Sequence, residues 1–231
     1  MKYLFVFLLV GLMVSCGNDA NKKYQIPQKV NRYPLDSVEL SEKSNKVILK
    51  STKQPVTGIV FENHSNGQNS SIENFRNGEW EGTQTYWYED GQMDKKLHYK
   101  SGQKDGMQFY WYSDGQNSSI ENFRNGEWEG TQTYWYEDGT KQLEVKYKNG
   151  KQNGISKKWY KNGQLEVETS WTDGKSDGKV DRGWFENGQL KYQGGKGWYS
   201  NGALRYETKM EGGKIIFSKC WDVDGNVIEC P

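Results

Sequence analysis

Side chains that commonly perform catalysis or bind metals are scarce in this sequence. Among 231 residues there are two histidines, His64 and His98, and neither lies at a metal-ligand spacing from other ligands. No Gly-x-Ser-x-Gly nucleophile motif is present. The 30 acidic residues provide many carboxylate pairs, but the pattern around them predicts solvated strand faces rather than a pocket. We therefore predict that the protein is not an enzyme and has no catalytic residue, no cofactor and no metal site.

Cys220 and Cys230 flank a turn in the stretch KCWDVDGNVIEC. Two strands joined at Asp224-Gly225-Asn226 would place these cysteines opposite each other, within reach of a disulfide bond. The alternative is two free thiols or a metal pair, which the lack of a nearby histidine makes weaker. The acidic run from Asp222 resembles the start of a calcium loop but lacks the acidic ligand that closes such a loop, so we interpret it as a hairpin turn.

Cys16 ends the stretch MKYLFVFLLVGLMVSC at the start of the chain. The apolar run from Tyr3 to Val14 is shorter than the roughly 17 to 25 residues that span a bilayer, so residues 1-15 are predicted to be a cleaved export signal. The end of this signal resembles the lipobox of bacterial lipoproteins, with Met13 as a departure. The resemblance implies a membrane-anchored lipoprotein of the bacterial cell envelope, lipidated at Cys16, on the periplasmic side or at the cell surface. The alternative is an ordinary secretory signal followed by a chance cysteine.

A fixed repeat must position the remaining residues. The segment from Gly67 to Gly91 is identical to that from Gly115 to Gly139, a displacement of 48 residues, and a weaker copy lies halfway, so the period is 24. Glycines mark this period at Gly58, Gly82, Gly106, Gly130, Gly154 and Gly178. A period of this length indicates a repeat architecture, in which each unit needs a similar neighbour to bury enough surface.

One repeat has the pattern of a β-hairpin. The unit from Gly130 to Asn153 contains two runs of β-favouring residues, separated by an Asp-Gly turn and closed by an Asn-Gly turn. Aromatic residues make up 14% of the chain, beside 27 glycines and 4 prolines, which fits a twisted sheet better than a helical bundle. We predict an all-β protein: an elongated, twisted antiparallel sheet of stacked 24-residue β-hairpin repeats.

Stacking the hairpins in register places aromatic residues in columns. The candidate binding face consists of two adjacent columns, Trp87, Trp111, Trp135 and Trp159 beside Tyr88, Tyr112, Tyr136 and Tyr160. A third column contains Phe75, Tyr99, Phe123, Tyr147 and Trp171. Aromatic neighbours on adjacent strands stabilise a sheet by roughly 0.2 to 1 kcal/mol per pair, so the columns are first expected to hold the sheet together. Ile72 and Leu97 lie at different distances from their column partners, which predicts either a bulge or a loose strand.

The repeats occupy most of the chain but not its ends. Residues 16-55 are polar and irregular, and we predict a lipidated tether in which Val47 to Leu49 form a possible capping strand. The repeat domain is predicted at residues 56-217, and a C-terminal hairpin cap with a disulfide at residues 218-231. An extra residue before Gly188 and the shortened segment GQLKYQGGKGWYSNG leave the number of complete units open.

Each repeat begins with a glycine, which is followed by an aromatic pair and then by Asn-Gly or Asp-Gly. A further aromatic residue lies two positions before the next Asp-Gly or Asn-Gly. The segment GISKKWYKNGQLEVETSWTDGKSDG shows the whole pattern. The pattern resembles MORN repeats, and more closely the variant repeats of the YwqK-type antitoxin family, over roughly residues 56 to 226. The resemblance implies a β-hairpin repeat sheet with a role in binding or assembly. An antitoxin role would require an exported target if the export signal is correct.

Charge and composition narrow the choice of partner. The formal net charge is +1, with both signs interspersed, whereas a nucleic-acid-binding protein normally has a basic patch. We therefore predict a scaffold that binds a protein partner, or a lipid, through its sheet face. The alternatives are a carbohydrate or cell-wall binder, because Trp-Tyr followed by Asn-Gly is also similar to choline- and glucan-binding repeats, and an antitoxin-like binder of an exported toxin.

Overall fold

The structure is a computed structural model that describes residues 30–211 and 214–230. The chain divides into two units after Val30, and every element below belongs to the second unit, which begins at Asn31. The predicted signal and Cys16 lie outside the described residues. Within the described part, no helix is long and apolar enough to cross a membrane.

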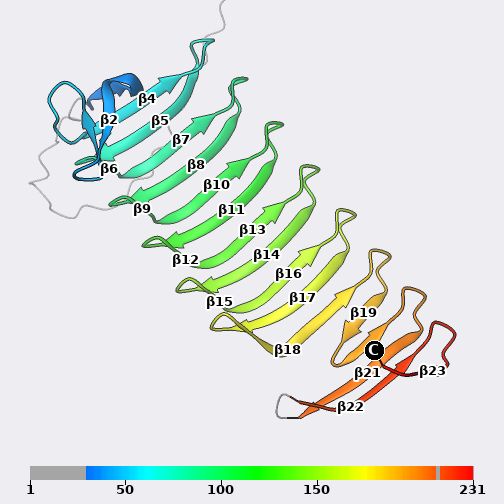
Figure 1. Ribbon diagram of the computed structural model, residues 1–231. Coiled ribbons are helices and arrows are strands. Elements are labelled where there is room, and N and C mark those ends of the chain that lie inside the picture. Colours follow the sequence, from blue (N-terminus) through cyan, green and yellow to red (C-terminus); the bar gives the residue numbers. More distant parts are fainter. Residues whose placement is uncertain (1–29, 212–213, 231) are drawn as a thin grey trace, which may run out of the picture. The chain divides into compact units, whose positions relative to one another are not determined.

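The second unit is built around one long open sheet whose strands pair in chain order (Figure 1). These strands are β4 (Gly58–Asn63), β5 (Asn69–Arg76), β6 (Glu79–Trp80), β7 (Gly82–Trp87), β8 (Met93–Lys100), β9 (Gln103–Lys104), β10 (Gly106–Trp111), β11 (Asn117–Arg124), β12 (Glu127–Trp128), β13 (Gly130–Trp135), β14 (Lys141–Lys148), β15 (Lys151–Gln152), β16 (Gly154–Trp159), β17 (Leu165–Thr172), β18 (Lys175–Trp184), β19 (Leu190–Gln193), β20 (Lys196–Trp198), β21 (Leu204–Glu211), β22 (Lys214–Trp221) and β23 (Val227–Ile228). The neighbouring pairs from β4 onward are antiparallel, and no α-helix occurs among the described residues. The predicted all-β sheet of hairpin repeats is therefore confirmed.

Asn-Gly pairs form tight turns along one edge of the sheet. Asn125 has φ 50° and Gly126 has φ 83°, and two successive positive φ values are what a type I′ hairpin turn requires. The Gly126 N–H donates to the Lys104 carbonyl of the preceding repeat at 2.8 Å, and the Asn125 N–H donates to the Asp105 carboxylate at 3.1 Å. Each tight turn is thereby tied to the repeat before it, which fixes the stacking register.

Five-residue turns form the opposite edge. In Tyr136–Thr140, the Asp138 carboxylate accepts the Thr140 N–H at 2.9 Å, the local bond that makes aspartate favourable in turns. Gly139 has φ 80°, and a Cβ atom there would lie 2.5 Å from Oε1 of Gln116 in the preceding repeat. The turn therefore requires glycine for its backbone conformation, whereas the flexible end of the Gln116 side chain could move to admit a Cβ.

Three repeats contain a glutamine with 0% exposure: Gln84, Gln108 and Gln132. Oε1 of Gln108 accepts the His98 backbone N–H at 2.9 Å, and Nε2 donates to the carbonyls of His98 and Gly106, each at 3.0 Å. These bonds lie where Asp105 interrupts the strand between β9 and β10. The glutamine thus supplies the partner of the His98 N–H and a second donor to the His98 carbonyl, which also accepts the Asp105 N–H at 2.9 Å.

An irregular N-terminal segment closes the first end of the sheet. It comprises β1 (Arg32–Pro34), which pairs parallel with β4, the 3-10 helix η1 (Leu35–Ser37), and the separate two-stranded sheet of β2 (Val38–Ser41) and β3 (Lys46–Leu49). Val38, Val56, Val60 and Phe75 form a buried cluster, against which Val47 also packs. Part of the segment expected to be a tether is therefore ordered, because its valines cover the apolar surface of the first repeat.

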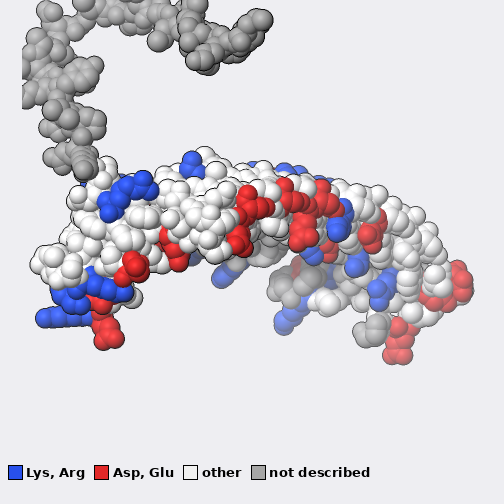
Figure 2. All heavy atoms as spheres, turned by 90° about the horizontal axis from the view of Figure 1, so that it is seen from above, with Lys and Arg blue, Asp and Glu red and all other residues white. Residues whose placement is uncertain are grey.

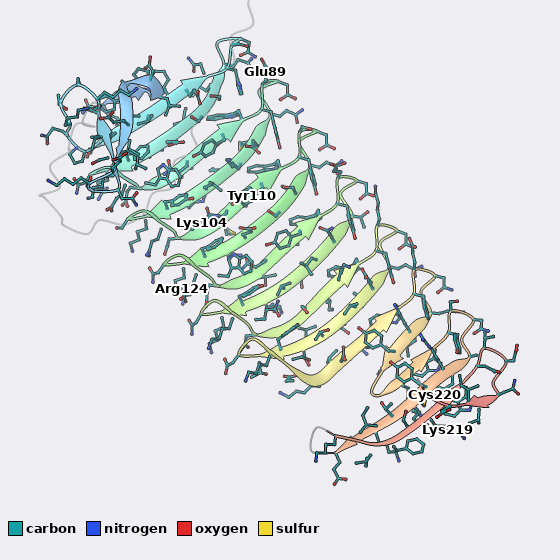
Figure 3. All side chains as sticks on the ribbon, viewed as in Figure 1. Glu89, Lys104, Tyr110, Arg124, Lys219 and Cys220 are labelled. Carbon is teal, nitrogen blue, oxygen red and sulfur yellow. A yellow bond between two sulfur atoms is a disulfide. The ribbon has the colours of Figure 1, made fainter. Side chains whose placement is uncertain are left out.

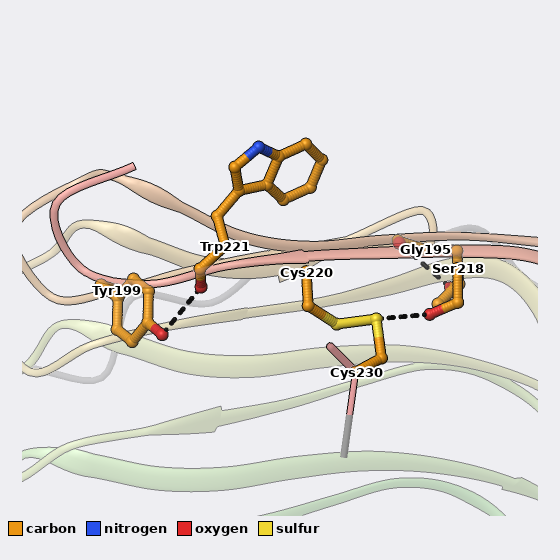
Figure 4. The surroundings of a disulfide bond; sticks show 7 residues. Gly195, Tyr199, Ser218, Cys220, Trp221 and Cys230 are labelled. Carbon is orange, nitrogen blue, oxygen red and sulfur yellow. Dashed lines mark hydrogen bonds between the residues drawn. A yellow bond between two sulfur atoms is a disulfide. The ribbon is translucent and has the colours of Figure 1, made fainter. Parts of the chain in front are cut away.

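The C-terminal end departs from the regular repeat. The hairpin of β19 and β20 is short, and its turn is made by Gly194 and Gly195. Beyond it, Cys220 on β22 forms a disulfide with Cys230, which follows β23, with Cα atoms 5.2 Å apart (Figure 4). The structure therefore contains the pairing that the hairpin turn predicts.

Candidate functional site

The two faces of the sheet carry different side chains. Alternate residues of a strand point to opposite faces, and directly paired residues on neighbouring strands share a face. We call one face the tyrosine face, after Tyr86, Tyr110 and Tyr134. We call the other the tryptophan face, after Trp87, Trp111, Trp135, Trp159 and Trp184. This division resolves the irregular column spacing: Ile72 pairs with Thr85 on the tryptophan face, whereas Leu97 pairs with Gln84 on the tyrosine face.

Tyrosine–glutamate pairs recur on the tyrosine face. The Tyr86 hydroxyl donates to Glu73 at 2.8 Å, and the Trp80 indole N–H donates to the second oxygen of that carboxylate at 3.1 Å. The Tyr134 hydroxyl donates to Glu121 in the same way, at 3.1 Å. Burial, and then the negative charge of the glutamate, raise the pKa of both tyrosines well above the ordinary value.

The raised tyrosine pKa values predict a loss of stability in alkali. The unfolded chain ionises these tyrosines near pH 10, the ordinary value, whereas the folded chain holds Tyr86 and Tyr134 neutral. Their contribution is fully present below pH 10 and is lost as pH rises through the raised folded-state values. Absorbance titration near 295 nm should show two late-ionising tyrosines that disappear in the Tyr86→Phe, Tyr134→Phe double variant. Titration of that variant indistinguishable from the parent chain would contradict the assignment.

Lys104 takes the position of Trp80 in the next repeat, beside Tyr110 (Figure 3). Its Nζ donates to the Tyr110 hydroxyl at 2.9 Å and lies 4.8 Å from the centre of the Phe123 ring. Burial lowers the pKa of Lys104, but the hydrogen bond to Tyr110 and the charge of Glu121 outweigh it, so the pKa lies above its ordinary value. The ammonium stays protonated and serves as a structural cation rather than as a base or nucleophile.

The tryptophan face presents a column of partly buried indoles. The Phe109 and Trp111 rings stack with centroids 5.9 Å apart. Farther along, Lys141 lies 5.3 Å from the centre of the Trp159 ring and Arg182 lies 5.6 Å from that of Trp184. Cations at these distances attract the faces of aromatic rings. Lys141 also contacts Glu144 at 2.9 Å and Arg182 contacts Glu168 at 2.6 Å, so the column combines apolar area with ion-paired cations.

A paired buried carboxylate lies within this face. Glu168 is 5% exposed, and its oxygens contact Lys157 at 3.3 Å and Arg182 at 2.6 Å. Burial raises the pKa of Glu168, but hydrogen bonds from the two cations outweigh it and the pKa lies below its ordinary value. Glu168 is thus an ionised, compensated acceptor, and it has no role as a proton donor at neutral pH.

The second candidate column joins neighbouring repeats. The hydroxyls of Tyr88, Tyr112, Tyr136 and Tyr160 each donate to the carbonyl of a tryptophan in the next repeat, at 2.8, 2.6, 2.9 and 2.9 Å. His64 occupies the corresponding place in the first repeat, and its Nε2 lies 2.9 Å from the Trp87 carbonyl. These tyrosines lie in the five-residue turns, so their hydroxyls are committed to stacking the repeats.

Removing one of these hydroxyls should weaken the stack measurably. Tyr112→Phe deletes the bond to the Trp135 carbonyl, and we expect it to lower the free energy of unfolding by about 1 kcal/mol, the usual net value of such a bond. Urea unfolding followed by tryptophan fluorescence would measure the change. Tyr33→Phe is the matched control, because the Tyr33 hydroxyl forms no hydrogen bond with the described residues. Equal effects of the two substitutions would refute the role.

The residues considered for metal binding are engaged with the backbone. Nδ1 of His98 lies 2.6 Å from the Met107 carbonyl, which makes this nitrogen the donor, as for Nε2 of His64. The Asp222 carboxylate accepts the N–H groups of Asp224 and Asn226, at 3.0 and 2.8 Å, as the predicted hairpin turn requires. Across residues 30–211 and 214–230, no group of three or more His, Cys, Asp or Glu residues is placed to hold a metal ion.

Charge differs between the two long edges of the sheet. Figure 2 shows a row of acidic side chains, and Figure 3 places Glu89 in a five-residue turn and Arg124 beside a tight turn at the opposite edge. Arg124 lies 3.7 Å from Glu129, so the basic residues of the tight-turn edge are partly neutralised. Their arrangement does not form the continuous basic surface that nucleic-acid binding requires.

Comparison with known families agrees with this architecture. The family described as MORN repeat variant matches residues 80–101, 128–149 and 152–173. The chain therefore carries MORN repeat variants at three positions, all of them within the long β-sheet. A comparison with curated proteins found no match.

Several site residues were not anticipated from the sequence. The buried glutamines recur every 24 residues on the same side of a strand as tyrosine, and that polar recurrence is the signal by which they could have been found. The Glu73–Tyr86 and Glu121–Tyr134 pairs recur every 48 residues, because Leu97 and Val145 occupy the glutamate position in the intervening repeats. The exact duplication therefore preserves these pairs.

Proposed function

We propose that this protein is a non-enzymatic scaffold that binds a protein partner through its tryptophan face and is held in the bacterial cell envelope by a lipid on Cys16. The column of partly buried indoles with adjacent cations supports this role. Aromatic residues and arginine are enriched at the centres of protein interfaces, where they contribute most of the binding energy. The YwqK-type resemblance fits a protein-binding role, and an exported toxin is one partner that this role would accommodate.

Features of the same face favour a protein over a carbohydrate. Sugar rings stack on open aromatic faces, but Phe109 already lies against Trp111 and Lys141 lies over Trp159. The exposed part of the column is broken by charged groups. Lys157 and Arg182 share the single carboxylate of Glu168, so this cluster keeps an excess of positive charge, which suits an acidic protein surface. We therefore propose a protein partner, and the experiment below distinguishes it from carbohydrate binding.

The proposed anchor and partner can be tested together by crosslinking in intact cells. We expect the full-length chain to crosslink to a specific protein, and the Trp111→Ala, Trp135→Ala double variant to lose at least about tenfold of that product, as expected when central aromatic contacts are removed. Cys16→Ala should release the chain from the membrane fraction. Circular dichroism would establish that each variant keeps its sheet.

The tyrosine face provides the matched control. Trp128→Ala removes an indole that packs 4.6 Å from the Tyr147 ring centre on the opposite face, so it should leave the crosslinked product unchanged if the chain stays folded. Loss of product from Trp128→Ala but not from the double variant would move the interface to the other face. Recovery of cell-wall glycan in place of protein would reject the proposal in favour of carbohydrate binding.

A further inference from the structure

The short hairpin near the C-terminal end leaves a notch in the sheet. β19 pairs with β18 only at Arg182, Gly183 and Trp184. Of the β18 residues before them, Lys175, Ser176 and Asp181 pair with β17, whereas Asp177–Val180 form a bulge without a strand partner. On the other side, β20 pairs with β21 only as far as Glu207, and the Thr208 N–H donates to the Gly195 carbonyl. Beyond that bond, Lys209–Glu211 pair with β22 alone. We call the gap between Lys175–Asp181 and Lys209–Glu211 the notch (Figure 1).

A cavity of about 450 Å³ occupies the closed end of the notch. Gly178, Val180, Arg182, Gln193, Gly195 and Thr208 are among its lining residues. Its wall on the β18 side is a bulged strand edge, in which the Lys179 N–H already donates to the Asp177 carboxylate at 3.1 Å. Such an edge carries backbone N–H and C=O groups that can pair with an added strand.

Gly178 lacks the aromatic partner that its equivalents possess. Five glycines at the same repeat position each pair with an aromatic residue on the following strand: Gly58 with Phe75, Gly82 with Tyr99, Gly106 with Phe123, Gly130 with Tyr147, and Gly154 with Trp171. The strand that would bring such a residue to Gly178 has already turned at Gly194.

Charges along the open edge alternate in sign. Lys175 and Asp181 are exposed and form no ion pair with the described residues, and Lys179 has a side chain that is 77% exposed. Lys179 contacts Asp177, whose carboxylate is also held by Ser170 and Thr172. An incoming strand would therefore gain most from acidic residues opposite Lys175 and Lys179, because opposite charges on paired strands stabilise a sheet.

The width of the notch limits what can enter it. β19 and β20 occupy the space between β18 and β21 at the closed end, so the open part has room for two strands. A second copy of this chain could offer its own β18, but β17 and the remaining sheet would follow and collide with β21. An extended segment or a hairpin from a different protein fits this space.

We propose that the notch is a docking site for an extended segment of a protein partner. The segment adds to β18 as an antiparallel strand, places an aromatic ring over Gly178, and places acidic side chains opposite Lys175 and Lys179. This inference rests on the proposed role as a protein-binding scaffold and identifies the partner by its chemistry: a strand-forming sequence with one aromatic residue between acidic ones.

A designed peptide can test the site on the full-length chain. The probe is a capped, fluorescently labelled peptide of alternating strand-forming residues, with one tyrosine aligned with Gly178 and a glutamate aligned with each of Lys175 and Lys179. Binding would be measured by fluorescence anisotropy. We expect replacement of the probe's tyrosine by alanine, or Lys179→Glu in the protein, to weaken binding by about threefold to fivefold each, as cross-strand pair energies imply. Lys148→Glu, an exposed lysine on β14, is the matched control and should have no effect.

Hydrogen exchange locates the bound peptide. We expect new protection of backbone amides between Lys175 and Asp181, since an added strand pairs with that edge. Equal affinity of the tyrosine and alanine probes, equal effects of Lys179→Glu and Lys148→Glu, or protection elsewhere would overturn the inference.

The same variants separate this inference from the proposed function. If the crosslinked partner is lost on Trp111→Ala, Trp135→Ala but is unaffected by Lys179→Glu and by excess peptide, the notch inference is wrong and the scaffold role stands. If the peptide docks as expected but the Trp111→Ala, Trp135→Ala variant crosslinks normally, the notch is a docking site and the proposal that the tryptophan face binds the partner is wrong.

Discussion

Gln108→Leu is expected to lower the free energy of unfolding by about 3 kcal/mol, because it leaves the His98 N–H without its hydrogen-bond partner and removes two bonds that the side-chain amide donates to carbonyls. The Gln108 side chain is 0% exposed, and it accepts the His98 N–H and donates to the carbonyls of His98 and Gly106. Leucine has a similar volume but can form none of these bonds. Urea unfolding measures the total effect, and hydrogen exchange at the His98 amide reports the local opening.

Two further substitutions make this result specific. Gln103→Leu alters an exposed glutamine on β9 and should change stability by less than about 0.5 kcal/mol. Gln108→Glu keeps an acceptor for the His98 N–H but loses the donor and buries a charge. Its deficit should shrink as pH falls and the carboxyl group becomes protonated. A Gln108→Leu chain as stable as the Gln103→Leu chain would show that the buried glutamine does not hold the strand interruption together.

Removing the disulfide should destabilise the C-terminal hairpin by about 2 to 3 kcal/mol, as expected for closing a short loop. Cys220 and Cys230 are separated by 10 residues, and β23 pairs with β22 only at two positions. Val227 and Ile228 are exposed, so little apolar burial holds this hairpin in the absence of the bond. Hydrogen exchange in the Cys220→Ser, Cys230→Ser variant should show faster exchange at β22 and β23.

Reduction of the native chain provides the control for this prediction. A reductant should accelerate exchange at β22 and β23 in the native chain and leave the double serine variant unchanged. Exchange at β13 and β14, in the middle of the sheet, should be the same in both chains, because each repeat contacts mainly its neighbours. Unchanged exchange at β23 after reduction would show that the bond contributes little to stability.

The hairpin architecture could be predicted from the sequence because its signals are local. Asn125-Gly126 and Asp138-Gly139 specify the two kinds of turn, and the 24-residue spacing specifies how the hairpins stack. The pairing of Cys220 with Cys230 followed from one such turn. Each inference needed only residues close together in the chain.

The burial of Gln108 could not be predicted from local sequence signals. Its environment depends on the interruption at Asp105, which removes backbone pairing and makes a polar side chain favourable inside the sheet. Strand alternation places Gln108 and Tyr110 on one face, but it does not reveal which polar residues are enclosed.

The tryptophan column and the tyrosine column of the candidate binding face have different roles in the structure. Trp135 ends a strand and lies on a sheet face, whereas Tyr136 begins the turn and donates its hydroxyl to the next repeat. The shortened segment after Gly188 was visible in the sequence as a missing part of a repeat. That it leaves Gly178 without an aromatic partner became clear only from the strand register.

Pairing between neighbours along the chain has a consequence for how this protein folds. In most all-β domains, distant segments must meet, and the entropy of closing long loops slows folding. Here Gly130 pairs with Tyr147 and Gly154 with Trp171, and the same short sequence separation recurs along the sheet. The contact order is therefore low for a β protein. Each hairpin can add to the last as soon as it is synthesised, so a growing chain need not wait for its C-terminal end before its first repeats are protected.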